Sequence, residues 1–328
     1  MDRFYQFSLM GARKIIAKKI LHSLDIPNRI CNANTASKII YDRLMDKNPC
    51  MITRFGSTEI DAITSYIGYK YHKNDILGFI TGKSPSWWNF NLEHLKYMKI
   101  NSGFFPLELN LLEKFSELIL RDIPEIDILG SWRFEENYLR KFYSQNIECI
   151  SLLLLEPFWG EKPWSRALED KKVLIIHPFT ELIIQQYRKR THLFKKKDIL
   201  PDFDLKTIKA VQSIENCNDF QTWFHALKYM EDEMDKIDYD ICLIGAGAYG
   251  MPLAAHAKRN GKKAIHLGGS LQLLFGIRGK RWDNPNYGIA TLKGPNKYID
   301  LFNEYWTYPG DEYKPQNSHC CDDNCYWK

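Results

Sequence analysis

Short runs of consecutive apolar residues recur along the chain, and segments with a different periodicity separate them. Continuous apolar runs are typical of strands that are buried on both faces of a sheet. They predict strands at residues 51–55, 126–129, 147–155, 173–176, 208–214, 240–244 and 263–267. In the intervening segments, apolar residues recur every three or four positions, the period of a helix with one buried face. This pattern predicts helices at residues 35–45, 109–120, 181–190, 221–236 and 252–259.

The alternation of strands and helices defines the expected fold class. It predicts an α/β protein with a Rossmann-like parallel sheet and helices on both faces. Residues 74–91 contain two glycines, a proline and two tryptophans, so we expect an irregular loop there. Ligands of such sheets bind beyond the carboxyl ends of the strands. The candidate chemistry should therefore lie just after the predicted strands.

The first 24 residues form a basic segment that predicts a helix. The basic residues alternate with apolar ones: Arg3, Arg13, Lys14, Lys18 and Lys19 with Phe4, Phe7, Met10, Ile15, Ile16, Ile20 and Leu21. Such a helix either lies on an anionic membrane surface or packs on the protein with its charges in water. Gly11 interrupts the pattern, and glycine costs about 1 kcal/mol in a helix interior. We therefore favour the packed helix.

These patterns divide the chain into three parts. We expect an N-terminal basic helical segment at residues 1–30, the α/β domain at residues 31–310, and a cysteine-containing tail at residues 311–328. The HCCDDNC stretch in the tail does not match the paired C-x₂₋₄-C spacing of structural zinc sites. The scattered cysteines lie mostly in apolar contexts and are interpreted as reduced core thiols.

Composition excludes several classes of protein. With 45% hydrophobic and 26% charged residues, the chain is not of the disordered type and can build a large core. The mean hydropathy is −0.39, and no apolar run approaches the roughly 20 residues that span a bilayer. The sequence shows no secretory leader, so we expect a cytoplasmic protein. A net charge of +5 is too small for a dedicated nucleic-acid binder, and the basic run at residues 188–197 is interpreted as a solvated helix end.

One glycine-rich turn follows a predicted strand and precedes a predicted helix. The GAGAYG segment at residues 245–250 matches GxGxxG through Gly245, Gly247 and Gly250. Such a turn lets the backbone approach a diphosphate at the positive end of a helix. A nicotinamide cofactor would also need an acidic residue about 20 positions on, where this chain has His266. We therefore predict a phosphate site and keep two alternatives, an NAD(P)-dependent oxidoreductase and a turn needed only for packing.

A second turn, RFGSTE at residues 54–59, follows the first predicted strand. Arg54 offers a planar fork that grips phosphate, and Glu59 offers hard oxygen ligands for a divalent cation. The alternative is local: Thr58 and Asp61 match a capping box, and Glu59 suits the positive end of a helix. The functional interpretation requires both turns to converge on one pyrophosphate.

Both turns resemble signatures of one known family. RFGSTE resembles the RFGDGE segment of the GT-D fold glycosyltransferases, a bacterial group with a D-x-E motif on a Rossmann-like domain. Residues 241–282 are similar to that group's second signature. The IHLGG, FGIRGKRW and terminal CYW segments look closest to GT-D-like proteins found with bacterial surface-polysaccharide genes. The resemblance covers residues 35–327.

This resemblance implies a specific activity. It implies transfer of a sugar from a nucleotide-diphosphate donor to a glycan or lipid-linked acceptor in capsule or exopolysaccharide biosynthesis. Glu59 corresponds to the motif's glutamate and would bind Mn²⁺ or Mg²⁺. Ser57 stands where the first aspartate of the motif would be, so the alternative is that Arg54 or the GAGAYG amides carry the leaving-group charge. A non-catalytic polysaccharide-assembly protein with a lost metal site is a further alternative.

The expected site residues follow from the two turns and from the strand ends. We predict catalytic roles for Glu59, His177 and His266, and we consider Glu135, Glu136 and Glu156 as alternative bases. The predicted nucleotide-sugar contacts are Arg54, Gly56, Ser57, Gly245, Gly247, Tyr249, Gly250, Gly268, Gly269, Arg278 and Lys280. The expected partners are the donor and the acceptor, without nucleic acid, and with peripheral contact at the inner membrane surface as a further expectation.

Overall fold

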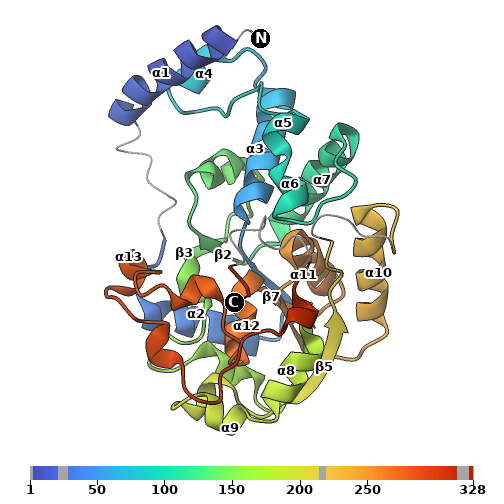
Figure 1. The fold of residues 1–328 in the computed structure, drawn as a ribbon. Coiled ribbons are helices and arrows are strands. Elements are labelled where there is room, and N and C mark those ends of the chain that lie inside the picture. Colours follow the sequence, from blue (N-terminus) through green and yellow to red (C-terminus); the bar gives the residue numbers. More distant parts are fainter. Residues whose placement is uncertain (1–2, 21–28, 214–218, 316–324, 328) are drawn as a thin grey trace.

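A seven-stranded parallel sheet forms the centre of the molecule (Figure 1). The computed structural model describes residues 3–20, 29–213, 219–315 and 325–327. The strand order is β3-β2-β1-β7-β6-β4-β5, and every adjacent pair is parallel. The strands are β1 (Cys50–Thr53), β2 (Ile128–Ser131), β3 (Glu148–Ser151), β4 (Lys172–His177), β5 (Asp204–Lys209), β6 (Ile241–Ile244) and β7 (Lys263–His266). This confirms the predicted α/β, Rossmann-like fold.

Helices cover both faces of this sheet. Successive strand residues point to opposite faces, so Met51 joins one buried core while Cys50 and Ile52 join the other. The first core is closed by α3 (Ser57–Tyr71), α7 (Leu109–Asp122), α10 (Trp223–Asp235) and α11 (Gly250–Arg259). The second core is closed by α2 (Ala33–Met45), α8 (Thr180–Tyr187) and α12 (Leu271–Leu274). The shorter helices are α4 (Ile76–Ile80), α5 (Leu92–Leu95), α6 (Tyr97–Ile100), α9 (Arg190–Leu193) and α13 (Ile289–Leu292).

Two predicted strands have different bounds in the structure. The expected strand at residues 147–155 ends as β3 at Ser151, and a 3-10 helix follows over Leu152–Leu155. The reason is pairing, because Ser151 lies opposite Ser131, the last residue of β2. The strand expected at residues 208–214 is β5, which begins earlier, at Asp204 opposite Lys172. β5 is an edge strand with exposed polar positions, so it lacks the continuous apolar run of a central strand.

The expected helices are present, with shifted ends. The region predicted as one helix at residues 181–190 contains α8, which ends at Tyr187, and α9, which begins at Arg190. The predicted loop at residues 74–91 contains the short helix α4. Among the described helices, none combines the length and the apolar character needed to cross a bilayer.

The N-terminal helix α1 (Arg3–Ile20) packs beside α4 at one end of the molecule (Figure 1). Its buried Leu9 joins a small cluster with Phe79 and Trp87. The expectation that its charges stay in water is wrong for Arg13, which donates to the carbonyl oxygens of Phe79 (3.0 Å) and Ser84 (3.1 Å). The helix continues through Gly11, whose α-carbon has no neighbouring atom that a side chain would meet. The predicted N-terminal helix is therefore present and packed.

Candidate functional site

A cavity of about 630 Å³ opens at the carboxyl edge of the sheet. The chain leaves β4 toward β5 on one side and leaves β6 toward β7 on the other, so a crevice forms between them. The two turns singled out in the sequence meet here, because Glu59 and Gly247 line the same cavity. The predicted site residues in its wall are Arg54, Gly56, Ser57, Glu59, His177, Gly245, Gly247, Tyr249, His266, Gly268 and Gly269.

The turn after β1 folds back on itself where α3 begins. Gly56 is the N-cap residue, and Glu59 lies in the first helical turn. The Glu59 carboxylate covers Gly56 so closely that a Cβ there would lie 1.8 Å from Oε2. Thr58 donates its hydroxyl to the same oxygen at 3.1 Å. The capping box expected between Thr58 and Asp61 is therefore not formed, because both residues lie inside the helix and Thr58 uses its side chain on Glu59.

The carboxylates near this turn do not form a metal site. Asp61 is paired with Arg133, with 2.8 Å between Oδ1 and Nη2. Burial raises the pKa of Asp61 to about 6, and the negative charge of Glu59 adds to the shift. Across the described residues, no group of three or more His, Cys, Asp or Glu side chains is arranged to hold a metal ion. Glu59 is thus a single carboxylate ligand, and these residues do not fit a divalent cation held by the protein alone.

Arg54 connects the turns after β1 and β7. Its Nε donates to the carbonyl oxygen of Phe55 at 2.9 Å, and its guanidinium lies 5.7 Å from the ring centroid of Trp132. Trp132 donates its indole N–H to the same carbonyl at 3.0 Å. A Cβ on Gly268 would lie 2.9 Å from Nη1 of Arg54, so the guanidinium reaches the turn after β7. The site therefore places a fixed positive charge between two backbone turns, where an anion can bind.

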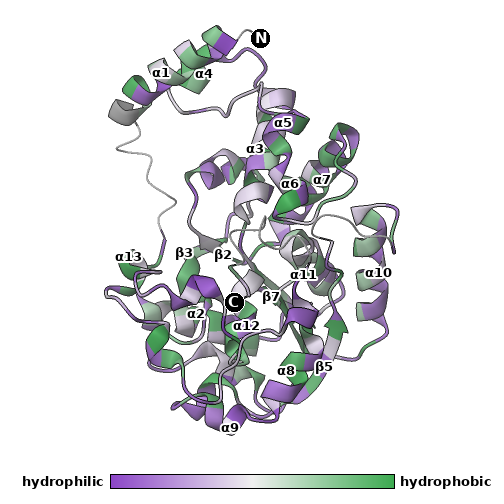
Figure 2. Cartoon of the chain, in the orientation of Figure 1, coloured by the Kyte–Doolittle hydropathy of each residue, from purple (hydrophilic) through white to green (hydrophobic). Residues whose placement is uncertain are grey.

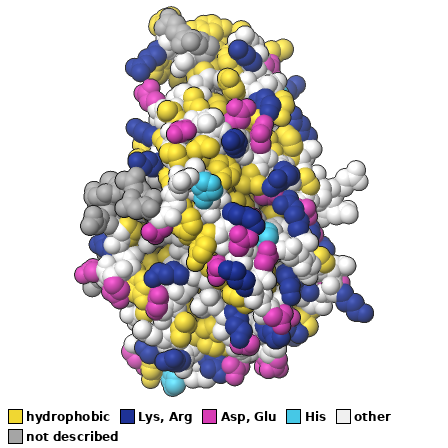
Figure 3. All heavy atoms as spheres, turned by 90° about the vertical axis from the view of Figure 1, so that its right-hand side faces the viewer, with side chains coloured by type: hydrophobic (Ala, Val, Ile, Leu, Met, Phe, Trp, Pro, Cys, Tyr) yellow, Lys and Arg dark blue, Asp and Glu magenta, His cyan; other side chains and the backbone are white. Residues whose placement is uncertain are grey.

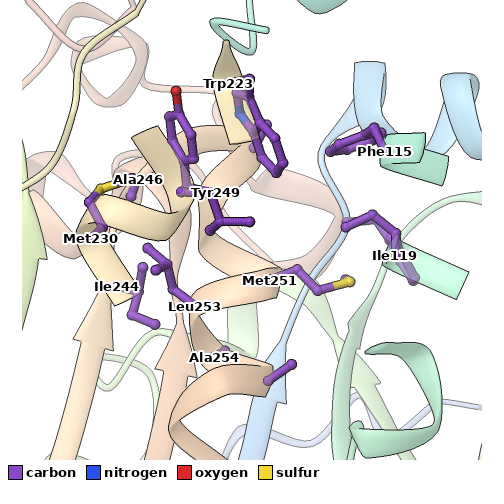
Figure 4. Close-up of a cluster of buried hydrophobic side chains, with 14 of the residues drawn as sticks. Phe115, Ile119, Trp223, Met230, Ile244, Ala246, Tyr249, Met251, Leu253 and Ala254 are labelled. Carbon is purple, nitrogen blue, oxygen red and sulfur yellow. The ribbon is translucent and has the colours of Figure 1, made fainter. Parts of the chain in front are cut away.

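The GAGAYG turn takes a backbone path that favours glycine. Gly247 has φ +52° and begins a 3-10 helix (Gly247–Tyr249) that leads into α11. Tyr249 anchors this turn, because its ring stacks on Trp223 with centroids 4.8 Å apart (Figure 4). Its hydroxyl is 2.9 Å from Oγ of Ser213, another residue of the cavity wall. The contacts of Tyr249 thus hold the turn in place, and its backbone lines the cavity.

Two histidines at strand ends are buried in the wall and are neutral. Burial lowers the pKa of His177 to about 3 and that of His266 to about 3, and the charge of Arg54 adds to the shift of His266. His177 accepts a hydrogen bond at Nδ1 from the backbone N–H of Phe179 (3.0 Å), so its proton is assigned to Nε2. Both residues are therefore weak proton acceptors at neutral pH.

Gly250 does not line the cavity but supports it. A Cβ at this position would lie 2.0 Å from Cε1 of His266. The third glycine of GxGxxG is thus required for the imidazole to lie under the turn. Its contribution to the site is packing, whereas Gly245 and Gly247 line the cavity.

Glu156 is the acidic side chain most altered by this environment. It is 6% exposed, lines the cavity, and accepts two hydrogen bonds at Oε2, from the Tyr298 hydroxyl (2.7 Å) and the Trp159 indole N–H (2.9 Å). Burial raises its pKa to about 7, although both hydrogen bonds act in the opposite direction. A carboxyl group of this kind exchanges a proton near neutral pH, as a catalytic acid or base must.

The other two acidic candidates have structural partners. Glu135 accepts from Nε of Arg133 at 2.8 Å. Glu136 is buried and accepts from the backbone N–H groups of Trp132 and Arg133, both at 3.0 Å. Neither is among the described residues that line the cavity. Of the three acidic alternatives, only Glu156 reaches the site.

A second wall of the cavity is built from connections, and it includes Tyr326 and Trp327. The backbone N–H of Arg281 donates to the carbonyl oxygen of Cys325 at 3.1 Å, and that of Lys280 donates to Trp327 at 2.8 Å. The ring of Tyr326 lies against Gly269, where a Cβ would be 1.9 Å from Cε1. Part of the predicted tail is therefore part of the site. Cys320 and Cys321 of the HCCDDNC stretch lie outside the described residues.

The predicted contacts Arg278 and Lys280 are not among the described residues of the cavity wall. Arg278 pairs with Asp283 at 2.8 Å and lies between the rings of Phe302 and Tyr308. The basic residue of this loop that does line the cavity is Arg281. Its Nη2 is 3.1 Å from Sγ of Cys325. The sequence pointed to the right loop, but docking of residues 325–327 selects which of its cations faces inward.

Several other residues of the wall have no clear signal in the sequence. They include Arg29, Ser102, Ser213, Gln272 and Tyr287. Arg29, Ser102, Ser213 and Tyr287 come from connections, and Gln272 lies on α12. Trp132 also lines the cavity. Only the path of the chain brings these side chains together.

The basic run at residues 188–197 lies outside the site. It contains α9, whose Leu193 is buried, followed by the buried Phe194, and its Arg190 pairs with Asp202 at 2.7 Å. The face of the molecule in Figure 3 shows basic and acidic side chains interspersed. This run is thus a helix end packed on the core.

Comparison with known proteins adds no relative. No protein-family model matches the chain, and no curated protein and no solved structure matches it.

Proposed function

We propose that this protein is a glycosyltransferase that moves a sugar from a nucleotide-diphosphate donor to a glycan or lipid-linked acceptor of a bacterial surface polysaccharide. The observation that carries the proposal is the convergence of RFGSTE, GAGAYG and HLGG on one cavity with Arg54 between them. The three segments are those in which the sequence resembles the GT-D fold glycosyltransferases. A diphosphate has the charge and size to bridge the turns that they form.

The first catalytic demand is stabilisation of the leaving group. When the bond between the anomeric carbon and the diphosphate oxygen breaks, the electron pair stays on the diphosphate. The guanidinium of Arg54 reaches from the turn after β1 to the turn after β7, and Arg281 also lines the cavity. Fixed cations of this kind stabilise the charge that develops in the transition state more than they stabilise the bound substrate. The single carboxylate of Glu59 does not fit a metal held by the protein, so this proposal assigns the charge to the arginines.

The second demand is removal of a proton from the acceptor hydroxyl. We assign this role to Glu156, because it lines the cavity and its pKa of about 7 suits proton transfer. Tyr298 and Trp159 both donate to Oε2 and fix the orientation of the carboxylate. The acceptor oxygen bonds to the anomeric carbon while its proton passes to Glu156. The neutral His177 and His266 suit an orienting role in the strand-end wall.

Isothermal titration with a panel of UDP-, GDP- and CMP-linked sugars tests the proposal. We expect binding of at least one diphosphate-linked sugar and displacement of that sugar by the free nucleoside diphosphate. CMP-linked sugars carry one phosphate and serve as the matched control, for which we expect weaker binding. No binding of any sugar nucleotide by the folded protein would contradict the proposal.

A second measurement separates the proposal from its two alternatives. An oxidoreductase should quench NADH fluorescence on binding, although β7 ends in His266 where such enzymes need an acid. A non-catalytic assembly protein should tolerate Glu156→Gln, whereas the proposed enzyme, which uses Glu156 as its base, should lose most of its turnover. Repeating the titration with EDTA tests whether donor binding depends on a metal, and we expect it not to.

A further inference from the structure

Helix α1 carries a second apolar face that the rest of the described protein does not cover. Phe4 is 79% exposed, Phe7 67% and Ile15 66%. With Gly11 they follow the three- and four-residue spacing of one helix face. The opposite face packs inward through the buried Leu9. This outer stripe therefore leaves large apolar surfaces exposed to water.

The charge of the helix shows what kind of surface can cover this stripe. The sequence of α1 contains Arg3, Arg13, Lys14, Lys18 and Lys19 and no acidic residue. Lys14 is exposed, and Arg3 faces Glu93 at 3.8 Å in a pair so exposed that it contributes little. Large apolar side chains next to lysine and arginine on one helix are typical of segments that lie in the interface of an anionic bilayer.

The position of α1 favours a broad, flat partner. Figure 1 shows α1 and α4 at the outer end of the molecule, away from the sheet, and Figure 2 shows hydrophobic and hydrophilic residues alternating along α1. The neighbouring α4 adds two exposed side chains, Ile76 (42%) and Leu77 (70%). The apolar residues thus belong to two adjacent helices at a projecting end. A lipid surface can contact such an end over its whole length.

We infer that the outer face of α1, with Phe4, Phe7 and Ile15 inserted among the headgroups, binds the protein to an anionic lipid bilayer. The Phe side chains would enter the interface, and Lys14 would meet lipid phosphates. Arg13 does not take part, because it is used to fix α1 on the residues of α4 and the following loop. This inference does not depend on the proposed transfer reaction.

Co-sedimentation of the full chain with vesicles tests the inference. We expect binding to mixed phosphatidylcholine and phosphatidylglycerol vesicles, and much weaker binding to phosphatidylcholine alone. The double variant Phe4→Ser/Phe7→Ser should reduce the affinity for the mixed vesicles at least roughly tenfold. Lys14→Glu should reduce it by roughly fivefold or more, with a loss that shrinks at high salt.

Controls separate the lipid from other occupants of the same face. Tyr229→Ser removes an aromatic side chain on α10 that is 44% exposed, and it should leave vesicle binding unchanged. Circular dichroism checks that each variant is folded. Failure of the wild-type protein to co-sediment with the anionic vesicles would overturn the inference. So would a dimer that dissociates on Phe4→Ser/Phe7→Ser without any vesicle binding, because a second copy would then cover the stripe. Failure here leaves the nucleotide-sugar titration unaffected.

Discussion

The two walls of the cavity are built in different ways. The strand-end wall comes from residues that directly follow parallel strands, such as Arg54, His177 and Gly245. The second wall, with Glu156 and Arg281, comes from connections. These are held by side-chain hydrogen bonds and by residues 325–327. Sheet register fixes the first wall, whereas contacts between distant segments fix the second. The difference shows that the sheet positions a site without supplying all of its chemistry.

Burial also has opposite consequences in the two walls. In the strand-end wall it lowers the pKa of His177 and His266 to about 3, and both stay neutral. In the second wall, burial raises the pKa of Glu156 to about 7. Burial disfavours the charged form in each case, but only the acid is brought into the range where it exchanges protons. If the proposed function is correct, this contrast places proton transfer in the wall that the sheet does not build.

Replacing Glu156 should have the largest effect. We expect Glu156→Gln to lower kcat by roughly 10²–10⁴-fold, because the acceptor hydroxyl loses its base. Donor affinity in the titration should stay close to wild type, since the amide keeps the size of the side chain. His177→Asn is the comparison from the other wall. A kcat within tenfold of wild type for Glu156→Gln would move the base back to the strand ends.

The two arginines of one loop give a matched pair. Arg281 lines the cavity, whereas Arg278 is held between two rings and paired with Asp283. Arg281→Ala should lower kcat by roughly 10²-fold, because one cation facing the leaving group is lost. Arg278→Ala should leave kcat unchanged and cost about 1 kcal/mol of stability in urea unfolding. Equal kinetic effects would show that the loop changes its conformation on binding.

A methyl group at Gly250 tests how tightly the strand-end wall is packed. The new Cβ would lie 2.0 Å from the His266 ring. Overpacking of this kind typically costs ~1–3 kcal/mol in the free energy of unfolding. Gly11→Ala is the control, because that position meets nothing and alanine should stabilise the helix by up to about 1 kcal/mol. Similar melting temperatures for both variants would contradict the close approach.

The pH dependence of stability separates the walls most finely. Each histidine has a pKa lowered from 6.5 to about 3, so it costs stability as pH falls below 6.5, by about 1.4 kcal/mol per pH unit. Glu156 has a pKa raised from 4.5 to about 7, so its stability contribution is full below pH 4.5 and is lost as pH rises through 7. Between pH 4.5 and 6.5, His177→Asn should therefore flatten the rise of stability with pH, and Glu156→Gln should steepen it. Urea unfolding across this range measures both, and unchanged slopes would contradict the assignment.

The strand-end wall could be predicted from the sequence because its signals are local. Buried central strands such as β4 and β6 are continuous apolar runs, and the residues after them must lie at the carboxyl edge. The edge strand β5 begins earlier than predicted because four of its six residues are polar. The capping box at Thr58 is wrong because the N-cap is Gly56, two residues earlier than the pattern predicts, and the helix begins at Ser57.

The second wall could not be predicted in the same way. Arg278, Lys280 and Arg281 look alike in sequence, and only the docking of Cys325 and Trp327 decides which of them faces the cavity. Glu156 was one of several acids, and its raised pKa comes from burial that the local sequence does not show. Its partner Tyr298 lies 142 positions away. Such contacts depend on the complete tertiary fold.

The return of residues 325–327 to the cavity has a consequence for how the protein matures. Ribosomes release a chain from its N-terminus, and early segments begin to pack before later ones exist. The sheet can assemble once β7 has emerged, but Tyr326 and Trp327 close the pocket only after some 60 further residues have followed. A nascent chain can therefore have a complete sheet while its cavity is still incomplete, until translation passes Trp327.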